Sequence, residues 1–508
     1  MNDIRHILVA CLLCICMASS AQTYEQTMRR HAWSGSANVN GMRQDTVSVS
    51  YAELKGSYEG GKFRDTWQPR HAWAVGASTA SVRHLDRMTL AGDFSFGQTE
   101  GYGQCGSMFI KPGTFPVDVL EFTPGRKTLQ TYSFNGGISY DIAPKFRIGA
   151  MMDFESSNIA KRKDLRHSNY RLDMMVSPGM TYSDGDLTLG ANYIFRKVSE
   201  TVEPEQIGTK ESSFYAFLDK GMMYGTYSVW SGNGLHLDEA GVKAFPVREM
   251  YSGLALQLQY RDFYSELGYS RISGTVGEKD FIWFRYPGNE IFGQVGYKHD
   301  ASAAVHYMRL SYGWKNVNLN ESVLEKVTEG GVTNVFCHGA NQILSKSEWN
   351  ICPEYEYASE RIDVIAHAGL NGSYSVSSQI YPYLYAQELL KWSVGVETKL
   401  YLESFNEKMK GLELDAGFRY DDGMVSEDRR MVSESAGAMK EPFRLQDYHD
   451  MQMEYATAPA MNFSLAMRYS FWKGLYVKAS AGLLCGMALR YLPGHTRTSA
   501  SLSLGYDF

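Results

Sequence analysis

The stretch RTSASLSLGYDF, residues 497–508, ends the chain and decides the fold. Side chains alternate between the two faces of a strand with a period of two residues. One face of this stretch therefore carries apolar side chains, those of Leu502, Leu504, Tyr506 and Phe508. The other face carries small or polar residues, Ser501, Ser503, Gly505 and Asp507. We predict a strand that has an apolar environment on one side and water on the other.

The same alternation recurs upstream in segments of about ten residues, the length that a strand needs to cross a bilayer. The clearest segments are 254–260, 263–269, 362–370, 392–402, 412–420, 463–471 and 475–483. Less regular segments are 46–59, 70–81, 85–97, 131–140, 145–155, 170–182 and 186–198. A soluble β-sandwich would also alternate, but both of its sheets would face one dry core. Charged residues recur on the second face here, which favours a single closed barrel with a watery lumen.

The connections between these segments alternate in length. The short ones are 141–144, 183–186, 300–302, 359–360 and 472–474. The long ones are 98–130, 156–169, 231–250, 316–345, 375–389 and 421–460. Outer-membrane barrels have short periplasmic turns and long extracellular loops. The sequence therefore predicts an all-β, antiparallel transmembrane barrel of about 18 strands, within a range of roughly 16 to 20, and segment 213–230 is the hardest to assign.

Residues 1–21 have the features of a signal peptide. Arg5 lies near the start, an apolar run covers residues 7–17, and small residues at 19–21 offer a cleavage site. A lipoprotein signal that ends at Cys11 is the alternative, but the apolar run continues past this residue. Export to the cell outer membrane is the expected outcome.

Two segments follow the signal peptide. Residues 22–45 are expected to form a short periplasmic segment, too short for a separate plug domain, and residues 46–508 the barrel. The terminal Phe508 resembles the signal that hands barrel proteins to the barrel-assembly machinery, although Ser503 stands where that signal usually has Gly. We therefore expect this machinery to be one partner of the chain.

The composition agrees with a barrel. Aromatic residues make up 13% of the 508 residues, and 34 of them are Tyr, which suits the aromatic girdles at the two membrane surfaces. The mean hydropathy of −0.31 is no objection, because only alternate residues of a barrel strand face lipid. The formal net charge of −6 gives no basis for nucleic-acid binding.

A basic run follows the strand predicted at 145–155, so it is expected outside the cell or at the barrel mouth. It consists of Lys161, Arg162, Lys163, Arg166 and His167 around a single Asp164. Such a run could attract anionic sugars or the phosphates of lipopolysaccharide. The alternative is a solvated loop whose charges pair with Asp164, Asp153 and Glu155.

Three stretches resemble a known family. They are NIAKRKDLRHSNYRLDMMVSPGMTY (residues 158–182), YSFNGGISYDI (residues 132–142) and the Phe-terminated last strand. All three are similar to an uncharacterised outer-membrane β-barrel family of Bacteroidota. The resemblance implies the fold and the location. It implies no activity and transfers no catalytic residue.

Charged residues on the second face of the C-terminal strands are the candidates for the lumen or its rim. They are Glu397, Lys399, Glu413, Asp415, Arg419, Arg468 and Lys478. Both signs of charge occur among them, as in the lining of water-filled pores. We predict no catalytic, cofactor-binding or metal-binding residue.

An outer-membrane hydrolase is the enzyme alternative. His299 is followed by Asp300, and His449 lies between Tyr448 and Asp450, but either His could be an ordinary solvated residue. The sequence contains neither a Gly-x-Ser-x-Gly elbow nor a His-Glu-x-x-His site. The sequence therefore favours a protein that is not an enzyme.

Two smaller features have structural consequences. Cys337 and Cys352 could form a disulfide in an oxidising periplasm, although sequence does not set connectivity. The glycine-rich stretch 97–106 lacks the Lys-Ser/Thr of a phosphate-binding loop, so a turn-rich outer loop is expected there.

The function that these features favour is passage of a solute through the barrel. The lumen residues would then set the selectivity, and loops 98–130, 316–345 and 421–460 would narrow the entrance. The alternative is a plugged barrel that anchors a surface lipoprotein or a secretion component. Outer-membrane lipid and lipopolysaccharide would surround the barrel in either case.

Overall fold

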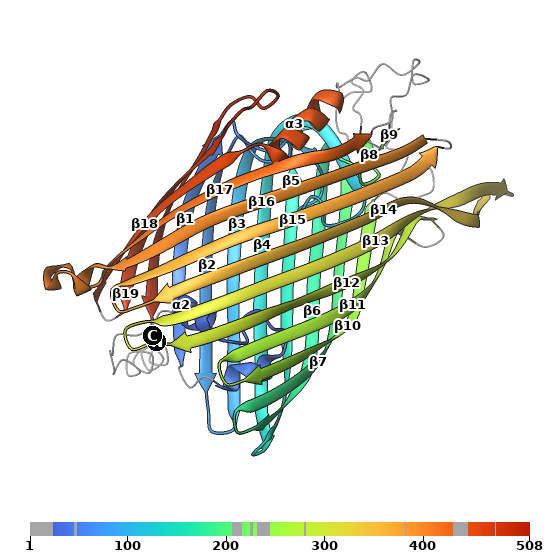
Figure 1. Ribbon diagram of the computed structural model, residues 1–508. Helices are drawn as coiled ribbons and strands as arrows, with labels where there is room; N and C mark the ends of the chain where they lie inside the picture. The colour runs from blue at the N-terminus through green and yellow to red at the C-terminus, as the bar shows by residue number, and fades with distance from the viewer. Residues whose placement is uncertain are drawn as a thin grey trace, which may run out of the picture.

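The computed structural model describes residues 24–44, 48–205, 216–223, 227–230, 244–278, 281–380, 383–429, 445–472 and 474–508. The signal predicted at residues 1–21 lies outside these ranges. The chain forms a closed antiparallel barrel of 18 strongly tilted strands (Figure 1). The predicted fold class and strand number are confirmed.

The strands of the barrel wall follow one another in chain order. In the first part of the chain they are β1 (Val49–Gly61), β2 (His71–His84), β3 (Met88–Ser107), β4 (Asp118–Ala143), β5 (Phe146–Lys161), β6 (Arg166–Asp184) and β7 (Leu187–Glu205). In the second part they are β10 (Phe245–Tyr260), β11 (Phe263–Glu278), β12 (Phe281–Asp300), β13 (Val305–Glu329), β14 (Val332–Ala358), β15 (Ile362–Ile380), β16 (Tyr383–Tyr401), β17 (Leu412–Arg429), β18 (Ala460–Trp472), β19 (Leu475–Gly486) and β20 (Thr496–Asp507).

The last strand closes the barrel on the first. β20 pairs with β1 in antiparallel register, so that Leu54 faces Leu504. Leu54, Leu502 and Leu504 are 61%, 62% and 48% exposed on the outer surface, whereas Ser503 on the opposite face is 3% exposed. An apolar outer face and a closed hydrogen-bond ladder are what a sheet needs in hydrocarbon, because no backbone group is left unpaired. The alternation predicted for residues 497–508 is confirmed.

The turns and loops lie at opposite ends of the barrel. Residues 144–145, 185–186 and 261–262 are short turns at one end, and the long connections lie at the other. The predicted long loops are nevertheless wrong in extent, because the described part of each continues the strands at one or both ends, while residues 231–243 and 430–444 lie outside the described residues. Segment 316–345 is almost wholly the outer half of the hairpin formed by β13 and β14, which have 25 and 27 residues. The hairpin projects beyond the rest of the wall (Figure 1).

Further corrections concern the same end of the barrel. The glycine-rich stretch 97–106 is part of β3 and not a loop. Segment 213–230 contains two short strands, β8 (Ala216–Asp219) and β9 (Tyr227–Trp230), which pair with each other. β8 also pairs with the start of β4. This small sheet extends the wall at β4 and is not part of the 18-stranded ring.

In the ranges that the structure describes, helices are few and short. They are α2 (Tyr24–Arg30) and α3 (Leu445–Thr457), together with the 3-10 turns η1 (Val39–Gln44), η3 (Leu402–Ser404) and η4 (Glu407–Met409). In the described part of the chain, none of the helices combines the length and the apolar character needed to cross a bilayer. α3 lies across the end with the long connections, and α2 lies near the other end (Figure 1).

Candidate functional site: a divided lumen

The predicted charged residues of the C-terminal strands meet inside the barrel. Lys399 on β16 forms an ion pair with Glu413 on β17 at 2.8 Å. Arg468 on β18 lies 3.8 Å from the same carboxylate, pairs with Asp507 on β20, and stacks over the ring of Tyr476. Five consecutive strands, β16 to β20, thus contribute to one network with charges of both signs on the lumen face.

The remaining candidates lie on the same face but differ in their partners. Asp415 has Lys399 and Lys478 as its nearest cations. Arg419 pairs with Asp421 two residues along β17, and its side chain is half exposed. Glu397 is an exposed residue on the face of β16 opposite Val394 and Val396. The structure distinguishes the network of Lys399, Glu413 and Arg468 from isolated charges such as that of Glu397.

The segment that precedes the barrel lies inside it. Arg30 of α2 forms ion pairs with Glu356 at 2.8 Å and with Asp363 at 2.7 Å, and both carboxylates are buried. Arg29 lies 3.5 Å from Glu354. These acceptors are on β14 and β15, near the end with the short turns. Residues 22–45 were predicted as a periplasmic segment, whereas the structure describes residues 24–44 within the lumen.

Side chains further along this segment bond to the opposite wall. The Trp33 indole donates to Gln259 at 2.5 Å and packs against the Tyr264 ring. The Asn38 amide donates to Gln257 at 3.0 Å, and the Ser139 hydroxyl donates to the Asn40 amide oxygen at 2.7 Å. Asn38 and Asn40 are 1% and 0% exposed. Buried amides are stable only when they are hydrogen-bonded, so these contacts define one position for the segment.

Glycines on the wall make room for this segment. A Cβ atom added at Gly149 would lie 2.6 Å from the Asn40 amide oxygen, and one added at Gly179 would lie 2.8 Å from that of Asn38. A Cβ atom added at Gly137 would be equally close to Val39, and one added at Gly190 would be equally close to Trp33. The wall of β4 to β7 is thus shaped to receive residues 33–40.

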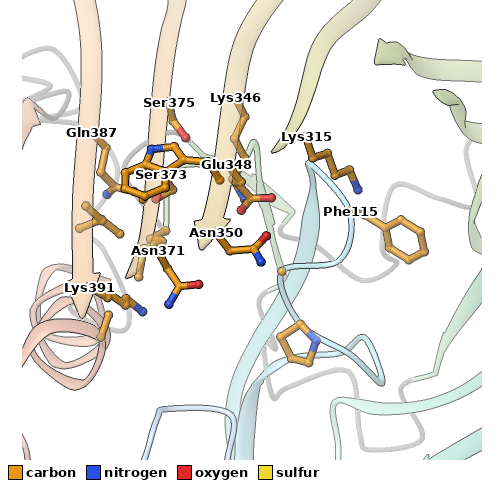
Figure 2. A pocket seen from close by; sticks show the side chains of 18 of the residues that line it. Phe115, Lys315, Lys346, Glu348, Asn350, Asn371, Ser373, Ser375, Gln387 and Lys391 are labelled. Atoms are coloured by element: carbon orange, nitrogen blue, oxygen red, sulfur yellow. The ribbon is translucent and has the colours of Figure 1, made fainter. Parts of the chain in front are cut away.

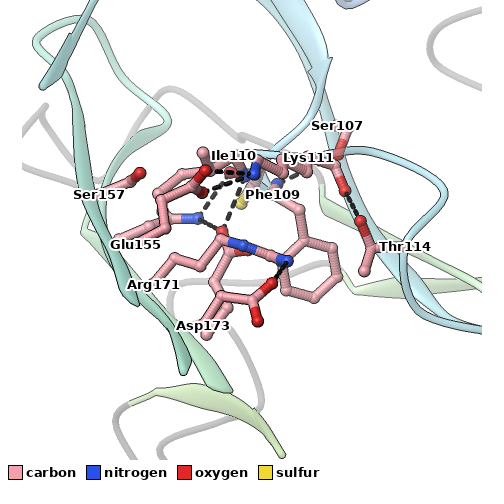
Figure 3. Close-up of polar contacts among 12 residues, drawn as sticks. Ser107, Phe109, Ile110, Lys111, Thr114, Glu155, Ser157, Arg171 and Asp173 are labelled. Atoms are coloured by element: carbon pink, nitrogen blue, oxygen red, sulfur yellow. Dashed lines mark hydrogen bonds and ion pairs between the residues drawn. The ribbon is translucent and has the colours of Figure 1, made fainter. Parts of the chain in front are cut away.

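A second inward segment, residues 108–117, connects β3 to β4. Its backbone is held by side chains of the wall: Ile110 N–H donates to Glu200 at 2.7 Å, and Asn169 donates to the Met108 carbonyl at 2.7 Å. The Lys111 ammonium pairs with Glu155 at 2.5 Å. Figure 3 shows the inward segment facing Glu155, Arg171 and Asp173 on β5 and β6.

Apolar residues of segment 108–117 build a dry core inside the barrel. Met108, Phe109, Phe115 and Val117 pack among buried side chains of β7 and of β10 to β14, such as Val247. The predicted watery lumen is therefore wrong for this sector. The alternation in the sequence does not predict this core, because a core residue and a lipid-facing residue are equally apolar.

The residues of the basic run, which was predicted as a loop, have different environments in the structure. Lys161 ends β5 and its fully buried ammonium pairs with the buried Glu121, while His167 on β6 bonds to Asn169 at 2.8 Å. Arg166 pairs with Asp164, and Lys163 donates to the Pro124 carbonyl. The expectation of one solvated loop is thus wrong for Lys161 and His167. These two residues lie beside Asn169, which holds segment 108–117.

Two chambers lie in the part of the lumen that the structure describes. The larger, about 890 Å³, lies between the inward segment and the wall formed by β13 to β16 (Figure 2). The smaller, about 460 Å³, lies against residues 33–42 of the N-terminal segment. Glu290 and Phe292 of β12 line both chambers. The two spaces therefore adjoin at β12.

The whole barrel matches one family model, over residues 40–508, described as a family of unknown function (DUF6850). The chain belongs to this family. No curated protein matches it in sequence.

Solved outer-membrane proteins are similar to this family member only in overall form. The copper transporter OprC has 8% identity and a TM-score of 0.42, with 91% of this chain and 80% of that one covered. The siderophore receptor PiuA from Acinetobacter baumannii has 9% identity and a TM-score of 0.38, covering 90% and 82%. OccAB3 from Acinetobacter baumannii has 10% identity and a TM-score of 0.33, covering 91% and 99%.

In this DUF6850 chain, α3 closes over the larger chamber. The Glu454 carboxylate accepts backbone N–H groups of Tyr491 at 2.9 Å and Leu492 at 2.6 Å, which ties the helix to the connection between β19 and β20. Both ring nitrogens of His449 are engaged, one by the Met223 carbonyl and one by Asp428 at 3.1 Å. A His held at both nitrogens has none left to activate a nucleophile.

Asp65 brings a titratable group into the larger chamber. It lies on the connection between β1 and β2, and its carboxylate accepts hydrogen bonds from the backbone and hydroxyl of Thr66. Burial raises the pKa of the Asp65 carboxyl to about 6, against the opposing effect of these hydrogen bonds and of Lys391. This connection was not among the predicted sites.

In the described ranges, the structure gives little support for a metal-binding site or a disulfide bond. Among the residues that the structure describes, no three His, Cys, Asp or Glu side chains are grouped as metal ligands. Cys337 and Cys352 are both free and both lie on β14, fifteen residues apart. An extended strand separates them by roughly 50 Å, so a disulfide between them is excluded.

Proposed function

We propose that this DUF6850 chain is an outer-membrane conduit for a small polar solute, narrowed by two segments of its own chain. The observation that carries the proposal is the pair of chambers that adjoin at Glu290 and Phe292. A lumen with polar groups on one wall and an apolar, lipid-exposed outer face is the arrangement of a transmembrane pore. The apolar outer face supports location in the outer membrane.

The N-terminal segment is the constriction at the end with the short turns. It is fixed by ion pairs and amide hydrogen bonds, and not by a continuous hydrophobic core. Each neutral hydrogen bond contributes only about 0.5–1.5 kcal/mol net, because water replaces it when the segment leaves. Such a segment can be displaced without unfolding the wall, so we propose that it acts as the gate of the conduit.

Several further properties belong to the same proposal. The signal peptide of residues 1–21 would direct export, and the barrel-assembly machinery would insert the chain with the short turns in the periplasm. Outer-membrane lipid and lipopolysaccharide would surround the wall. The resemblance of residues 158–182 implies a bacterium of the Bacteroidota as the source. The protein would not be an enzyme.

Single-channel recording in planar bilayers tests the conduit. Stepwise conductance of the purified wild-type protein is expected. Folded insertion is verified separately, by heat-modifiable migration in gel electrophoresis and by protection from protease. Membranes that stay electrically sealed despite folded insertion would contradict the proposal.

Such sealed membranes would support a second function, a plugged barrel that anchors a surface lipoprotein or secretion component. The observation that favours it is the amount of chain inside the lumen, namely residues 24–44 and 108–117. A plugged barrel should bind its partner whether or not the N-terminal segment can move. Deletion of residues 24–44 should then open the lumen while partner binding persists.

A further inference from the structure

Three neighbouring strands present a regular array of side chains to the larger chamber. The register of the sheet pairs Lys346 with Ser375, Glu348 with Ser373, and Asn350 with Asn371. It continues from Ser375 to Gln387, from Ser373 to Leu389, and from Asn371 to Lys391. These nine residues on β14, β15 and β16 are called the polar grid below. All nine line the chamber.

The grid is polar at eight of its nine positions. Strands lie about 4.8 Å apart and alternate residues about 6.7 Å apart, so the grid covers roughly 10 Å by 13 Å. Its side chains are three amides, two hydroxyls and the partly buried ammonium of Lys391, together with the paired Lys346 and Glu348 and the apolar Leu389 (Figure 2). A patch of this size matches a small ligand and not a macromolecule.

Much of this hydrogen-bonding capacity is available. Within the part of the chain that the structure describes, the side chains of Asn350, Asn371 and Ser373 make no hydrogen bond to another residue. Each amide side chain offers two donor hydrogens and one acceptor oxygen, and a hydroxyl offers both roles. Asn350 and Asn371 face each other directly across two strands, so their amides can engage one ligand together.

The charges of the chamber argue against an anionic ligand. Lys346 is neutralised by Glu348 at 2.6 Å, and Lys315 lies 3.9 Å from Glu249. Lys391 has Asp65 and Asp421 as its charged neighbours. Each of these three lysines has a carboxylate as a neighbour, so an anion would meet cations whose charge is already offset.

Flat apolar surfaces complete the chamber. Trp67 and Phe115 line it from the two connections that fold inward, and Tyr455 lines it from α3. Aromatic rings bury an apolar face of a ligand while the grid bonds to its polar edge. A ligand with hydroxyls around its edge and C–H groups on its faces satisfies both surfaces.

We propose that the larger chamber binds a neutral, hydroxyl-rich solute, a polyol or a short saccharide, on the polar grid of β14, β15 and β16. This inference rests on the proposed function, since it names the substrate class of the same conduit. The Asn350 and Asn371 amides bond to ligand hydroxyls, and Trp67 packs on the face of the ligand. Release toward the smaller chamber then passes Glu290 and Phe292.

Tryptophan fluorescence of the folded protein in detergent micelles tests binding, with sorbitol, glucose, maltose and maltotriose as probes. A saturable change is expected with at least one probe, and Trp67→Phe should reduce its amplitude. Asn371→Leu should weaken binding about tenfold or more, which corresponds to the loss of one or two neutral hydrogen bonds. Ser373→Val is the second variant of the grid and should weaken binding in the same direction.

Asn462→Leu is the matched control, because Asn462 also faces the lumen but lies on β18, outside both chambers. It should bind like the wild type. The absence of a saturable change with all four probes would overturn the inference, and so would equal effects of Asn371→Leu and Asn462→Leu. Binding without conductance refutes only the conduit, whereas conductance without binding refutes only this inference.

Discussion

Gly149 of β5 and Gly179 of β6 are register partners, and the side chains of Asn40 and Asn38 occupy the space that a Cβ atom would need at either position. The wall and the N-terminal segment are therefore complementary in shape as well as in hydrogen bonding. Complementary close packing of this kind is lost when one larger side chain is introduced. A larger side chain at such a wall glycine can displace the segment while the sequence of the segment itself stays unchanged.

Gly179→Leu should expel the segment from its position, whereas a Cβ atom at Gly149 would also lie 2.5 Å from the Ile138 carbonyl oxygen of the wall. Overpacking costs about 1–3 kcal/mol when neighbours cannot move, and here the segment can leave while the wall remains. Single-channel steps should become larger than those of the wild type. Gly97→Leu is the control, since a Cβ atom at Gly97 meets no atom within 4 Å. Equal step sizes in the Gly179 and Gly97 variants would refute the displacement.

Arg30→Met should loosen the same segment by a different route. It leaves the buried carboxylates of Glu356 and Asp363 without their main cation, a cost on the order of 3 kcal/mol for a buried pair. Trypsin should then cleave after Arg43 of the folded protein much faster than in the wild type. Arg419→Met removes a half-exposed pair and should leave the cleavage rate unchanged. Identical rates in the Arg30 variant and the wild type would show that the segment is held by other contacts.

Asp65 should make stability depend on pH. Its pKa is raised to about 6 in the folded chain, so the folded state keeps a proton that the unfolded chain releases near its ordinary pKa of 3.8. The resulting stabilisation is complete below the ordinary value and is lost as the pH rises through about 6. Relative to Asp65→Asn, the wild type should lose on the order of 2–3 kcal/mol between about pH 4 and pH 7. Urea unfolding in micelles measures this difference, and parallel pH profiles would contradict it.

Labelling of Cys337 tests the orientation of the barrel in the membrane. It is an exposed thiol on the projecting hairpin of β13 and β14, at the end opposite the short turns. A membrane-impermeant maleimide should therefore label intact cells that express the protein. Cys337→Ser should abolish the surface label, because Cys105 is buried and Cys352 and Cys485 are partly buried. Labelling that requires lysed cells would reverse the proposed orientation.

The alternation of side chains was sufficient to predict the wall. The apolar and polar faces of 497–508 are the outer and inner faces of β20, and Lys399, Glu413 and Arg468 share the lumen face. The two faces of a strand can be read locally in the sequence, because side chains alternate between them with a period of two. The number of strands follows from the same local signal.

The contents of the lumen could not be predicted in this way. Trp33 meets Gln259, and Arg30 meets Glu356, across more than two hundred residues of chain. A polar segment inside a barrel has the same composition as a solvated tail, so its position depends on partners that alternation does not reveal. The nearest signal was the repeated Gly at lumen positions, such as Gly149 and Gly179, where a wall side chain would be expected.

The environment of the charged residues in the basic run could not be predicted from the sequence either. Lys161 is fully buried against Glu121, although its neighbours Arg162 and Lys163 gave the run the character of a surface loop. A buried cation is stable only opposite a specific carboxylate, and that carboxylate lies forty residues earlier on β4. β5 extends beyond the bilayer and therefore includes Lys161. The apolar alternation of the sequence did not predict this extension.

Single-channel conductance of the wild type against a variant that lacks residues 24–44 tests the central claim most directly. The account predicts small steps for the wild type and clearly larger steps for the deletion variant, with the folded barrel intact in both. Equal steps in the two proteins would contradict a conduit that is gated by its own N-terminal segment.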